Sequence, residues 1–357
     1  MRIVHFSDIH LSKLNHNEFI RRFRDKLIED LERNINNEKK IDLIVITGDL
    51  IDKSGDTLLD VESYKDFENP YDIFEAIFIT PLCNNLGISK SQILFIPGNH
   101  DIDRTKKLFC IEYKIHNNIN SLNTEDYLEK NRKNDFLFSK NIERFKKFEH
   151  KYHFINGTPN YFYTNNHSTF IYKTSKNENI GILLMNDSWR CSGFEKYRKL
   201  KSHYLGHTQI DESMDNIIGY DTRINICLLH HALSDFEDKN EIERLLNYYN
   251  IELILFGHYH EKNISELLFE RNKCVLLRTK ATLNNPNAIE EKYQSGYQVI
   301  DLDLVSRKIS KINYRKYDYN KIEFIDDGFK NDISFIKNRS NTKNISYNIK
   351  KSDFKKD

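Results

Sequence analysis

Residues 93–101 read Ile-Leu-Phe-Ile-Pro-Gly-Asn-His-Asp, and the fold can be worked out from this stretch outward. Four apolar residues in a row, Ile93 to Ile96, are typical of a short strand covered on both faces of a sheet. The Pro-Gly pair at 97–98 ends that strand, because proline cannot donate to a ladder and glycine permits a sharp turn. Residues 99–101 therefore follow the carboxyl end of the strand, where open α/β sheets carry their chemistry. Since Asn, Asp and Gly are also ordinary turn formers, the stretch alone leaves a functional site and a plain turn equally open.

Length and composition limit the class of protein. A chain of 357 residues can form one large α/β domain with insertions, or two domains. Hydrophobic residues make up 39% and charged residues 30%, which predicts a core beneath a very polar surface. The formal net charge is +1, so no global basic field indicates nucleic acid, although a local basic patch would suffice.

Cysteine usage and the amino-terminal sequence favour a reducing cytoplasm. The cysteines are odd in number and far apart, so neither a disulfide framework nor a zinc ribbon fits; they are Cys83, Cys110, Cys191, Cys227 and Cys274. We expect no signal peptide at residues 1–8, because the apolar run is short and is broken by His5 and Asp8. No segment approaches the roughly 20 apolar residues of a membrane span, so we expect no membrane partner.

Four further strand-like runs are followed at once by side chains that can bind metal. The runs and these residues are 3–6 with Asp8 and His10, 41–47 with Asp49, 224–229 with His230, and 253–256 with His258 and His260. Asp8 and His10 project to the same side of an extended chain, so they can reach one ion together. One such pairing is weak evidence, but five strand ends in a chain with 14 histidines are not easily chance.

The order of the remaining elements indicates an α/β fold. Apolar residues repeat every four positions in a helical stripe that we interpret as core packing: Phe19, Phe23, Leu27, Leu31 and Ile35. A second helix is expected over 71–86, and three successive strand–helix units predict parallel strands. Later helices are expected at 209–218 and 241–249, with strands at 170–174, 180–185, 275–279, 297–302 and 308–314.

Carboxylate, amide and imidazole ligands without a thiolate favour Mn²⁺, Fe or Zn²⁺ over a structural zinc or a calcium site. We expect Mn²⁺, with Fe or Zn²⁺ as alternatives. The ligands exceed the needs of one ion, whereas two ions that share a bridging carboxylate would use them all.

In chain order, the motifs Asp-x-His, Gly-Asp, Gly-Asn-His-Asp, His and Gly-His-x-His resemble those of the calcineurin-like metallophosphoesterase family. The resemblance extends from Met1 to about His260, with the closing strands, and omits the segment after Asp101. With the strand–helix order it implies a four-layer α/β/β/α sandwich of two mixed sheets flanked by helices. The family domain would span 1–317 with a helical insertion at about 102–165, followed by a polar extension at 318–357.

The resemblance also implies a role for each motif residue. The first ion would be held by Asp8, His10 and His260. The second ion would be held by Asn99, His230 and His258, and Asp49 would bridge the two ions. His100 would face the scissile phosphate, as proton donor to the leaving group or as a stabiliser of transition-state charge. Asp101 would hydrogen-bond His100 and orient it.

The implied reaction is hydrolysis of a phosphoester. Two ions roughly 4 Å apart would clamp the phosphate and lower the pKa of a bridging water, whose hydroxide attacks in line. Residues 1–11 and 95–101 look more like bacterial cyclic-nucleotide phosphodiesterases and the nuclease subunit of the double-strand-break repair complex than like protein phosphatases. We therefore expect a phosphodiester substrate, nucleic acid or a cyclic nucleotide. The alternatives are a phosphomonoesterase and a non-catalytic interaction module of the same fold.

Several positions stay open at the sequence level. His231 is the alternative to His230 as the ligand. Asn186 and Arg190 follow a strand and are candidate substrate contacts, although a surface turn is the simpler interpretation there. Trp189 is expected in the core, with base stacking as the alternative. The insertion is either a cap over the metals or a plain helix pair, and its basic residues are Arg104, Lys106, Lys107, Lys114, Arg132, Lys133, Arg144, Lys146 and Lys147.

Overall fold

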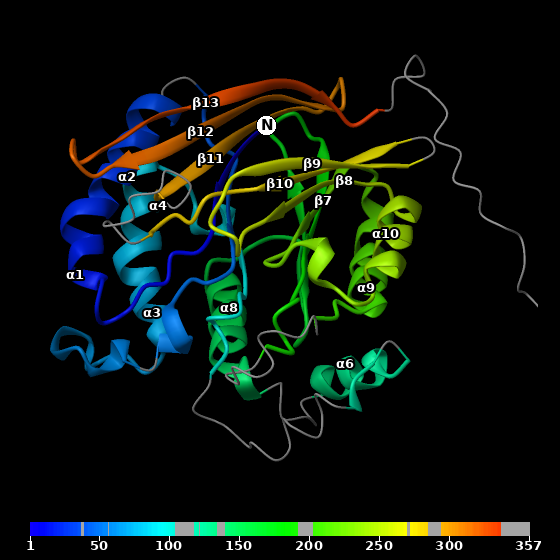
Figure 1. The fold of residues 1–357 in the computed structure, drawn as a ribbon, viewed down its shortest axis with the longest axis horizontal. Helices are drawn as coiled ribbons and strands as arrows, with labels where there is room; N and C mark the ends of the chain where they lie inside the picture. Colours follow the sequence, from blue (N-terminus) through cyan, green and yellow to red (C-terminus); the bar gives the residue numbers. More distant parts are fainter. Residues whose placement is uncertain are drawn as a thin grey trace, which may run out of the picture.

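Two mixed β-sheets pack face to face, and helices cover both outer faces (Figure 1). This computed structural model describes residues 1–36, 39–55, 57–103, 118–120, 122–133, 140–191, 203–269, 272–284 and 294–336. The expected four-layer α/β/β/α sandwich is confirmed.

The first sheet contains the amino-terminal strands at its centre and one edge. In spatial order its strands are β13 (Glu323–Ser334), β12 (Lys308–Asp318), β11 (Gly296–Asp303), β1 (Arg2–Phe6), β2 (Leu43–Thr47) and β3 (Ile93–Ile96). Strands β1, β2 and β3 are parallel, as the strand–helix order predicted, and β11 to β13 are antiparallel to their neighbours.

The second sheet contains the later strands. In spatial order they are β4 (Tyr161–Tyr163), β5 (Ser168–Lys173), β6 (Asn179–Leu184), β7 (Thr222–Leu228), β8 (Ile251–Phe256), β10 (Lys273–Arg278) and β9 (Asn263–Leu268). The hairpin of β5 and β6 was expected, and the parallel pairs β6–β7, β7–β8 and β8–β10 follow it.

Alternation along the strands divides the apolar residues between three layers. In β3, Leu94 and Ile96 point into the core between the sheets, whereas Ile93 and Phe95 meet the helices on the outer face. The helices on that face are α1 (His16–Glu18), α2 (Asp25–Asp30), α3 (Pro70–Phe74), α4 (Thr80–Leu86) and α8 (Glu143–Ile155); α9 (His207–Ile217) and α10 (Lys239–Tyr248) cover the other sheet.

The amino-terminal helix keeps its four-residue stripe buried by mixing helix types. An α-helix has 3.6 residues per turn, so an apolar repeat of four would drift around it. The segments η1 (Phe19–Arg24) and η2 (Leu31–Asn36) are π-helical, and π turns contain more residues. The stripe residues are consequently all at most 3% exposed: Phe19, Phe23, Leu27, Leu31 and Ile35.

The described part of the insertion contributes helix α8 to the outer layer of the first sheet, whereas helix α6 (Thr124–Arg132) lies beside the start of α9. Phe148 of α8 stacks on Phe95 of β3 with ring centroids 5.2 Å apart, so α8 covers the sheet and not the metal edge. Five basic residues of the insertion are paired with carboxylates, which favours the plain helix pair; they are Arg132, Lys133, Arg144, Lys146 and Lys147. Arg104, Lys106, Lys107 and Lys114 lie outside the described residues.

Three strands were not expected from the sequence. Strand β4 forms within the expected helical insertion, and β9 follows His260. Strand β13 pairs with β12 along most of its length, so the first sheet continues past residue 317 into the segment expected to be a polar extension. Residues 337–357 lie outside the described part of the chain.

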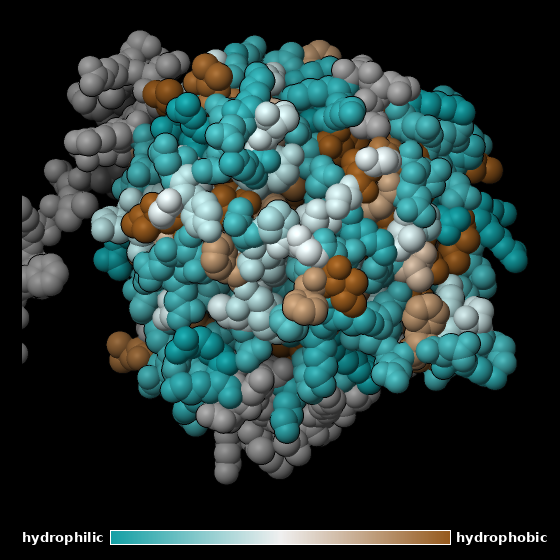
Figure 2. Space-filling view, turned by 180° about the vertical axis from the view of Figure 1, so that it is seen from behind, coloured by the Kyte–Doolittle hydropathy of each residue, from teal (hydrophilic) through white to brown (hydrophobic). Residues whose placement is uncertain are grey.

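The surface is polar, as the charged fraction predicted. Seen from behind, the described residues are mainly hydrophilic, and apolar side chains are scattered among them (Figure 2). Within the described residues, no helix combines the length and the apolarity needed to cross a membrane.

Phe148→Ala should lower the free energy of unfolding by about 3 to 5 kcal/mol, because Phe148 is 1% exposed between α8 and β3. Phe154→Ala on the same helix is the matched control: its ring is 79% exposed, so its effect should stay below about 0.5 kcal/mol. Urea unfolding of both variants measures this. Equal losses would mean that α8 does not pack as described.

Candidate metal centre

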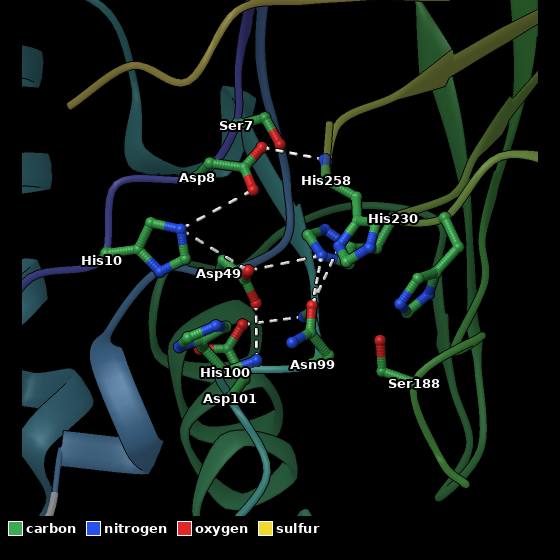
Figure 3. A network of polar contacts seen from close by, with 12 residues as sticks. Ser7, Asp8, His10, Asp49, Asn99, His100, Asp101, Ser188, His230 and His258 are labelled. Carbon is green, nitrogen blue, oxygen red and sulfur yellow. Dashed lines mark hydrogen bonds and ion pairs between the residues drawn. The ribbon is translucent and has the colours of Figure 1, made fainter. Parts of the chain in front are cut away.

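The carboxyl ends of five strands meet at one edge of the sandwich. Strands β1, β2 and β3 belong to the first sheet, and β7 and β8 to the second. Nine of the sequence-predicted residues are brought together there: Asp8, His10, Asp49, Asn99, His100, Asp101, His230, His258 and His260. Figure 3 shows side chains from both sheets pointing into one shared space.

The backbone of several of these residues is strained. Asp8, His10, Asp49, His258 and His260 all have positive φ, between 49° and 68°, in the left-handed region that non-glycine residues rarely occupy. Such conformations cost of order 1 to 3 kcal/mol each and persist at sites where the surrounding structure imposes them. Here they turn consecutive polar side chains out of each strand end toward the centre.

Two glycines permit the close approach of these strand ends. Gly48 has φ +88°, and a Cβ there would stand 2.4 Å from Nδ1 of His230. A Cβ on Gly257 would stand 1.8 Å from Oγ of Ser7 and 2.6 Å from Oδ2 of Asp8. A larger residue at either position would therefore push the two sheets apart at the centre.

One group of donors surrounds the carboxylate of Asp8. Its Oδ1 lies 3.3 Å from Nε2 of His260 and 3.7 Å from Nε2 of His10. Its Oδ2 accepts a hydrogen bond of 3.0 Å from the backbone N–H of His258, which ties β1 to β8. The side chains of Asp8, His10 and His260 are the set expected for the first ion.

A second group surrounds the side-chain oxygen of Asn99. This Oδ1 lies 3.0 Å from Nε2 of His230 and 3.1 Å from Nδ1 of His258. These three side chains are the set expected for the second ion, and they come from β3, β7 and β8.

Asp49 lies between the two groups (Figure 3). Its Oδ2 is 3.7 Å from Nε2 of His10 on one side and 3.4 Å from Nε2 of His230 on the other. Its Oδ1 accepts a hydrogen bond of 2.7 Å from the backbone N–H of His100. A carboxylate in this position can contact two cations at once.

Burial and neighbouring charges shift the pKa values in opposite directions. Burial opposes the charge of His230, but the carboxylate of Asp49 outweighs it and raises the pKa of His230 to about 10. Burial and the neighbouring imidazoles lower the pKa of His258 to about 3. Burial would raise the pKa of Asp49, yet His230 and His10 hold it well below its usual range. The carboxylate of Asp49 therefore stays ionised in the centre.

The donor set fits divalent cations. Asp8 is fully buried, and its Oδ1 makes no hydrogen bond within the described structure, which is costly unless a cation meets it. The donor atoms of the two groups are carboxylate and amide oxygens and imidazole nitrogens, the ligands that Mn²⁺, Fe and Zn²⁺ share.

His100 is oriented by a residue that the sequence reasoning missed. Its Nδ1 lies 2.7 Å from Oδ1 of Asp52, and its side chain is 32% exposed at the mouth of the centre. This hydrogen bond from His100 is the largest cause of the lowered pKa of Asp52. Asp52 closes the sequence Gly-Asp-Leu-Ile-Asp at 48–52, and that second carboxylate was the available signal.

Asp101 is held in a hydrogen-bond network of its own. Its Oδ2 accepts hydrogen bonds from the backbone N–H of Gly98 at 2.8 Å and Leu50 at 3.3 Å, and its Oδ1 accepts from Ile51 and from the Tyr71 hydroxyl at 3.0 Å. Asp101 therefore fastens the loop after β3 to the loop after β2. The Nδ1 of His100 lies against Asp52, and orientation of His100 by Asp101 stays a prediction.

Asp187 fastens the loop after β7 in the second sheet, and the sequence did not indicate this role. Its Oδ2 accepts from the backbone N–H groups of His230 at 2.8 Å and His231 at 2.9 Å, and its Oδ1 lies 3.1 Å from Nδ1 of His231. The carbonyl of Thr47 lies 2.8 Å from Nδ1 of His230 and accepts a hydrogen bond from it, which leaves Nε2 facing Asn99 and Asp49. The Nε2 of His230 therefore faces the centre, whereas the Nδ1 of His231 faces Asp187.

The segment around Trp189 is buried, where a surface turn was expected. Trp189 is 1% exposed, and its indole N–H donates to the carbonyl of Tyr204 at 2.7 Å, so it is a core residue. Asn186 is 2% exposed and Arg190 is 4% exposed, with its guanidinium over the Tyr204 ring. Substrate contact by these two residues stays a prediction, and Arg104 lies outside the described residues.

A two-sheet α/β sandwich with carboxylate, amide and imidazole groups at its strand ends is a metallophosphoesterase fold. The chain belongs to the calcineurin-like phosphoesterase family, whose sequence pattern matches residues 1–262. It is also similar to the uncharacterized metallophosphoesterase-like protein YydB of Bacillus subtilis (strain 168), at 23% identity over 269 residues. That match covers 74% of this chain and 50% of YydB, so the chain spans about half the length of this relative.

Solved structures with a related architecture are distant in sequence. PhoD aligns with 92% of this chain and 71% of its own, with a TM-score of 0.49 and 10% identity. GAP50, the anchor in the inner membrane complex of Plasmodium, aligns with 95% of this chain and 90% of its own, with a TM-score of 0.46 and 11% identity. The purple acid phosphatase PPD1 of yellow lupin aligns with 91% of this chain and 52% of its own, with a TM-score of 0.42 and 14% identity.

Asp101→Asn should destabilise the protein by about 2 to 4 kcal/mol, because an amide nitrogen would face backbone N–H donors in a fully buried network. Asp52→Asn is the control, since Asp52 is half-buried and should cost less than about 1 kcal/mol. Denaturant unfolding without added metal distinguishes them. Similar stabilities of the Asp101 variant and wild type would remove the structural role assigned to Asp101.

Proposed function

We propose that this protein hydrolyses a phosphodiester at a centre of two divalent metal ions. The observation that carries the proposal is the position of Asp49, which lies between two separate groups of oxygen and imidazole donors. Asp8, His10 and His260 would hold one ion; Asn99, His230 and His258 would hold the other; and Asp49 would bridge them. Mn²⁺ is the proposed metal, with Fe or Zn²⁺ as alternatives.

When bound, two such ions supply Lewis acidity: they neutralise phosphate charge and lower the pKa of a bound water. The protein's own residues supply position. Thr47 and Asp187 fix the ring of His230 and its backbone, and Asp8 holds the loop of His258. These contacts leave the ligand nitrogens facing inward before any ion arrives, which limits the reorganisation needed on binding.

His100 is the proposed general acid. It stands at the mouth of the centre, with its ring 4.5 Å from that of His10, and Asp52 holds its Nδ1. Nε2 is thereby left to hold a proton toward the leaving oxygen of the ester. Attack of a water on the phosphorus would break the P–O bond to the leaving group, and that proton would go to the departing oxygen. A diester substrate would then give an alcohol and a phosphomonoester.

The complete ligand set supports an enzyme over a non-catalytic module of the same fold. Whether a monoester is also accepted is decided by comparing p-nitrophenyl phosphate with bis(p-nitrophenyl) phosphate, and we propose that the diester is preferred. The described cysteines Cys83, Cys191, Cys227 and Cys274 are buried and are not in disulfides, in keeping with a reducing cytoplasm as the proposed location.

Asp49→Asn should abolish Mn²⁺-dependent hydrolysis of bis(p-nitrophenyl) phosphate and reduce the bound metal measured by elemental analysis, because the bridge loses its charge. EDTA should inactivate the wild type, and Mn²⁺ should restore it. Asp60→Asn, at an exposed position, is the matched control. Wild-type turnover that survives complete metal removal would contradict the two-ion proposal.

His100→Ala should retain its metal but lose turnover by a factor of order 100 or more, as expected when a positioned acid is removed. His150→Ala, at an exposed histidine of α8, should leave both quantities unchanged. Loss of the bound metal from the His100 variant would place this imidazole among the ligands instead.

A further inference from the structure

A cavity of about 520 Å³ opens beside the metal centre. Three of its lining residues, His10, Asp52 and His260, belong to the centre or hold His100 in place. The cavity is therefore continuous with the space where the phosphate is proposed to bind. Its volume is in the range of about 300 to 1,000 Å³ typical of small-molecule sites.

The rest of the cavity wall is largely apolar and aromatic. It includes Leu14, Phe19, Phe23, Tyr317, Tyr319 and Ile322. Phe19, Phe23 and Tyr317 are buried and form a firm floor, whereas Leu14 is 96% exposed and Ile322 is 43% exposed. Two large apolar side chains thus face solvent at the opening, where an incoming apolar group would cover them.

The backbone at the opening is strained as well. Ile322 has φ +57°, and a β-branched residue in the left-handed region is a genuine outlier. Its N–H donates to the carbonyl of Asp318 at 2.8 Å, which holds the turn between β12 and β13. The turn keeps the Ile322 side chain at the cavity despite this cost.

Polar side chains outside the metal centre also line the cavity, and two of them are charged; the others are Ser12, Asn15 and Asn284. Glu18 and Arg22 line the cavity and stand four residues apart, so they lie on the same side of the helix. A carboxylate accepts hydrogen bonds from ring N–H or sugar hydroxyl groups. A guanidinium donates to carbonyl oxygens and stacks on planar rings.

We propose that this cavity binds the organic group of the phosphoester, and that this group is a nucleoside: a planar heterocycle joined to a sugar. The inference rests on the proposed function, because the two metal ions would hold the phosphate at His10 and His260. The apolar floor then takes the ring, and Glu18 and Arg22 meet its polar edges. A methyl or short alkyl group would leave most of the volume unfilled.

The test compares two diesters with the same leaving group, thymidine 5′-(p-nitrophenyl phosphate) and methyl p-nitrophenyl phosphate, with Mn²⁺ present. The wild type should favour the thymidine ester by about tenfold or more in kcat/KM, the discrimination expected from an apolar pocket. Leu14→Asp should reduce this preference about tenfold by placing a charge at the opening. Arg22→Ala should reduce it by a smaller factor.

Leu268→Asp is the matched control. Leu268 is 66% exposed and pairs with Lys273 at the end of β9 remote from the centre, so the wild-type preference should persist. Calorimetry gives a second readout, in which thymidine 5′-monophosphate should bind more tightly than methyl phosphate. Equal kcat/KM for the two esters together with equal binding would overturn the nucleoside site. Selective binding without turnover of either ester would support the site and overturn the proposed hydrolysis.

Discussion

The carboxylate of Asp49 is the charge around which this structure is arranged. It is 1% exposed, and a buried charge is tolerated only when it is paired and hydrogen-bonded. The partners come from three other strand ends: His10 after β1, the backbone N–H of His100 after β3, and His230 after β7. Satisfying this one group brings both sheets to a common edge, and the glycines at 48 and 257 let the chains come close enough to do so.

Each sheet also has a buried aspartate that organises the loops around the centre. Asp101 accepts N–H groups from the loops after β2 and β3, and Asp187 accepts the N–H groups of His230 and His231 after β7. Neither carboxylate is placed among the metal ligands. Burial and Asp49 raise the pKa of Asp101 to about 7, and burial also raises the pKa of Asp187. The sandwich thus pays a local electrostatic cost to make its ligand loops rigid.

The sequence predicted the parts of the molecule in which one local pattern has one meaning. Short apolar runs that end in Asp, Asn or His correctly indicated β1, β2, β3, β7 and β8, because these strands are buried on both faces. Strands β9 and β13 were missed because they lie at sheet edges, where exposed polar side chains hide the strand period. The hydrogen-bond partners of His100 and of Asp101 could not be predicted from the sequence either. Asp52 and Asp101 are both carboxylates near a histidine, and only the three-dimensional path of the loops decides which one meets the imidazole.

The separation of Asp101 from His100 has a consequence for how this chain can diverge. His100 is half-exposed, so its loss would remove chemistry while leaving the loops in place. Asp101 is fully buried and connects two loops to Tyr71, so its loss would disturb the loops that carry Asp49 and Asn99. A descendant that lost the proposed hydrolysis and served only as a binding partner would therefore be free to change His100 but would be selected to keep Asp101. Among relatives of this chain, Asp101 should be retained more often than His100.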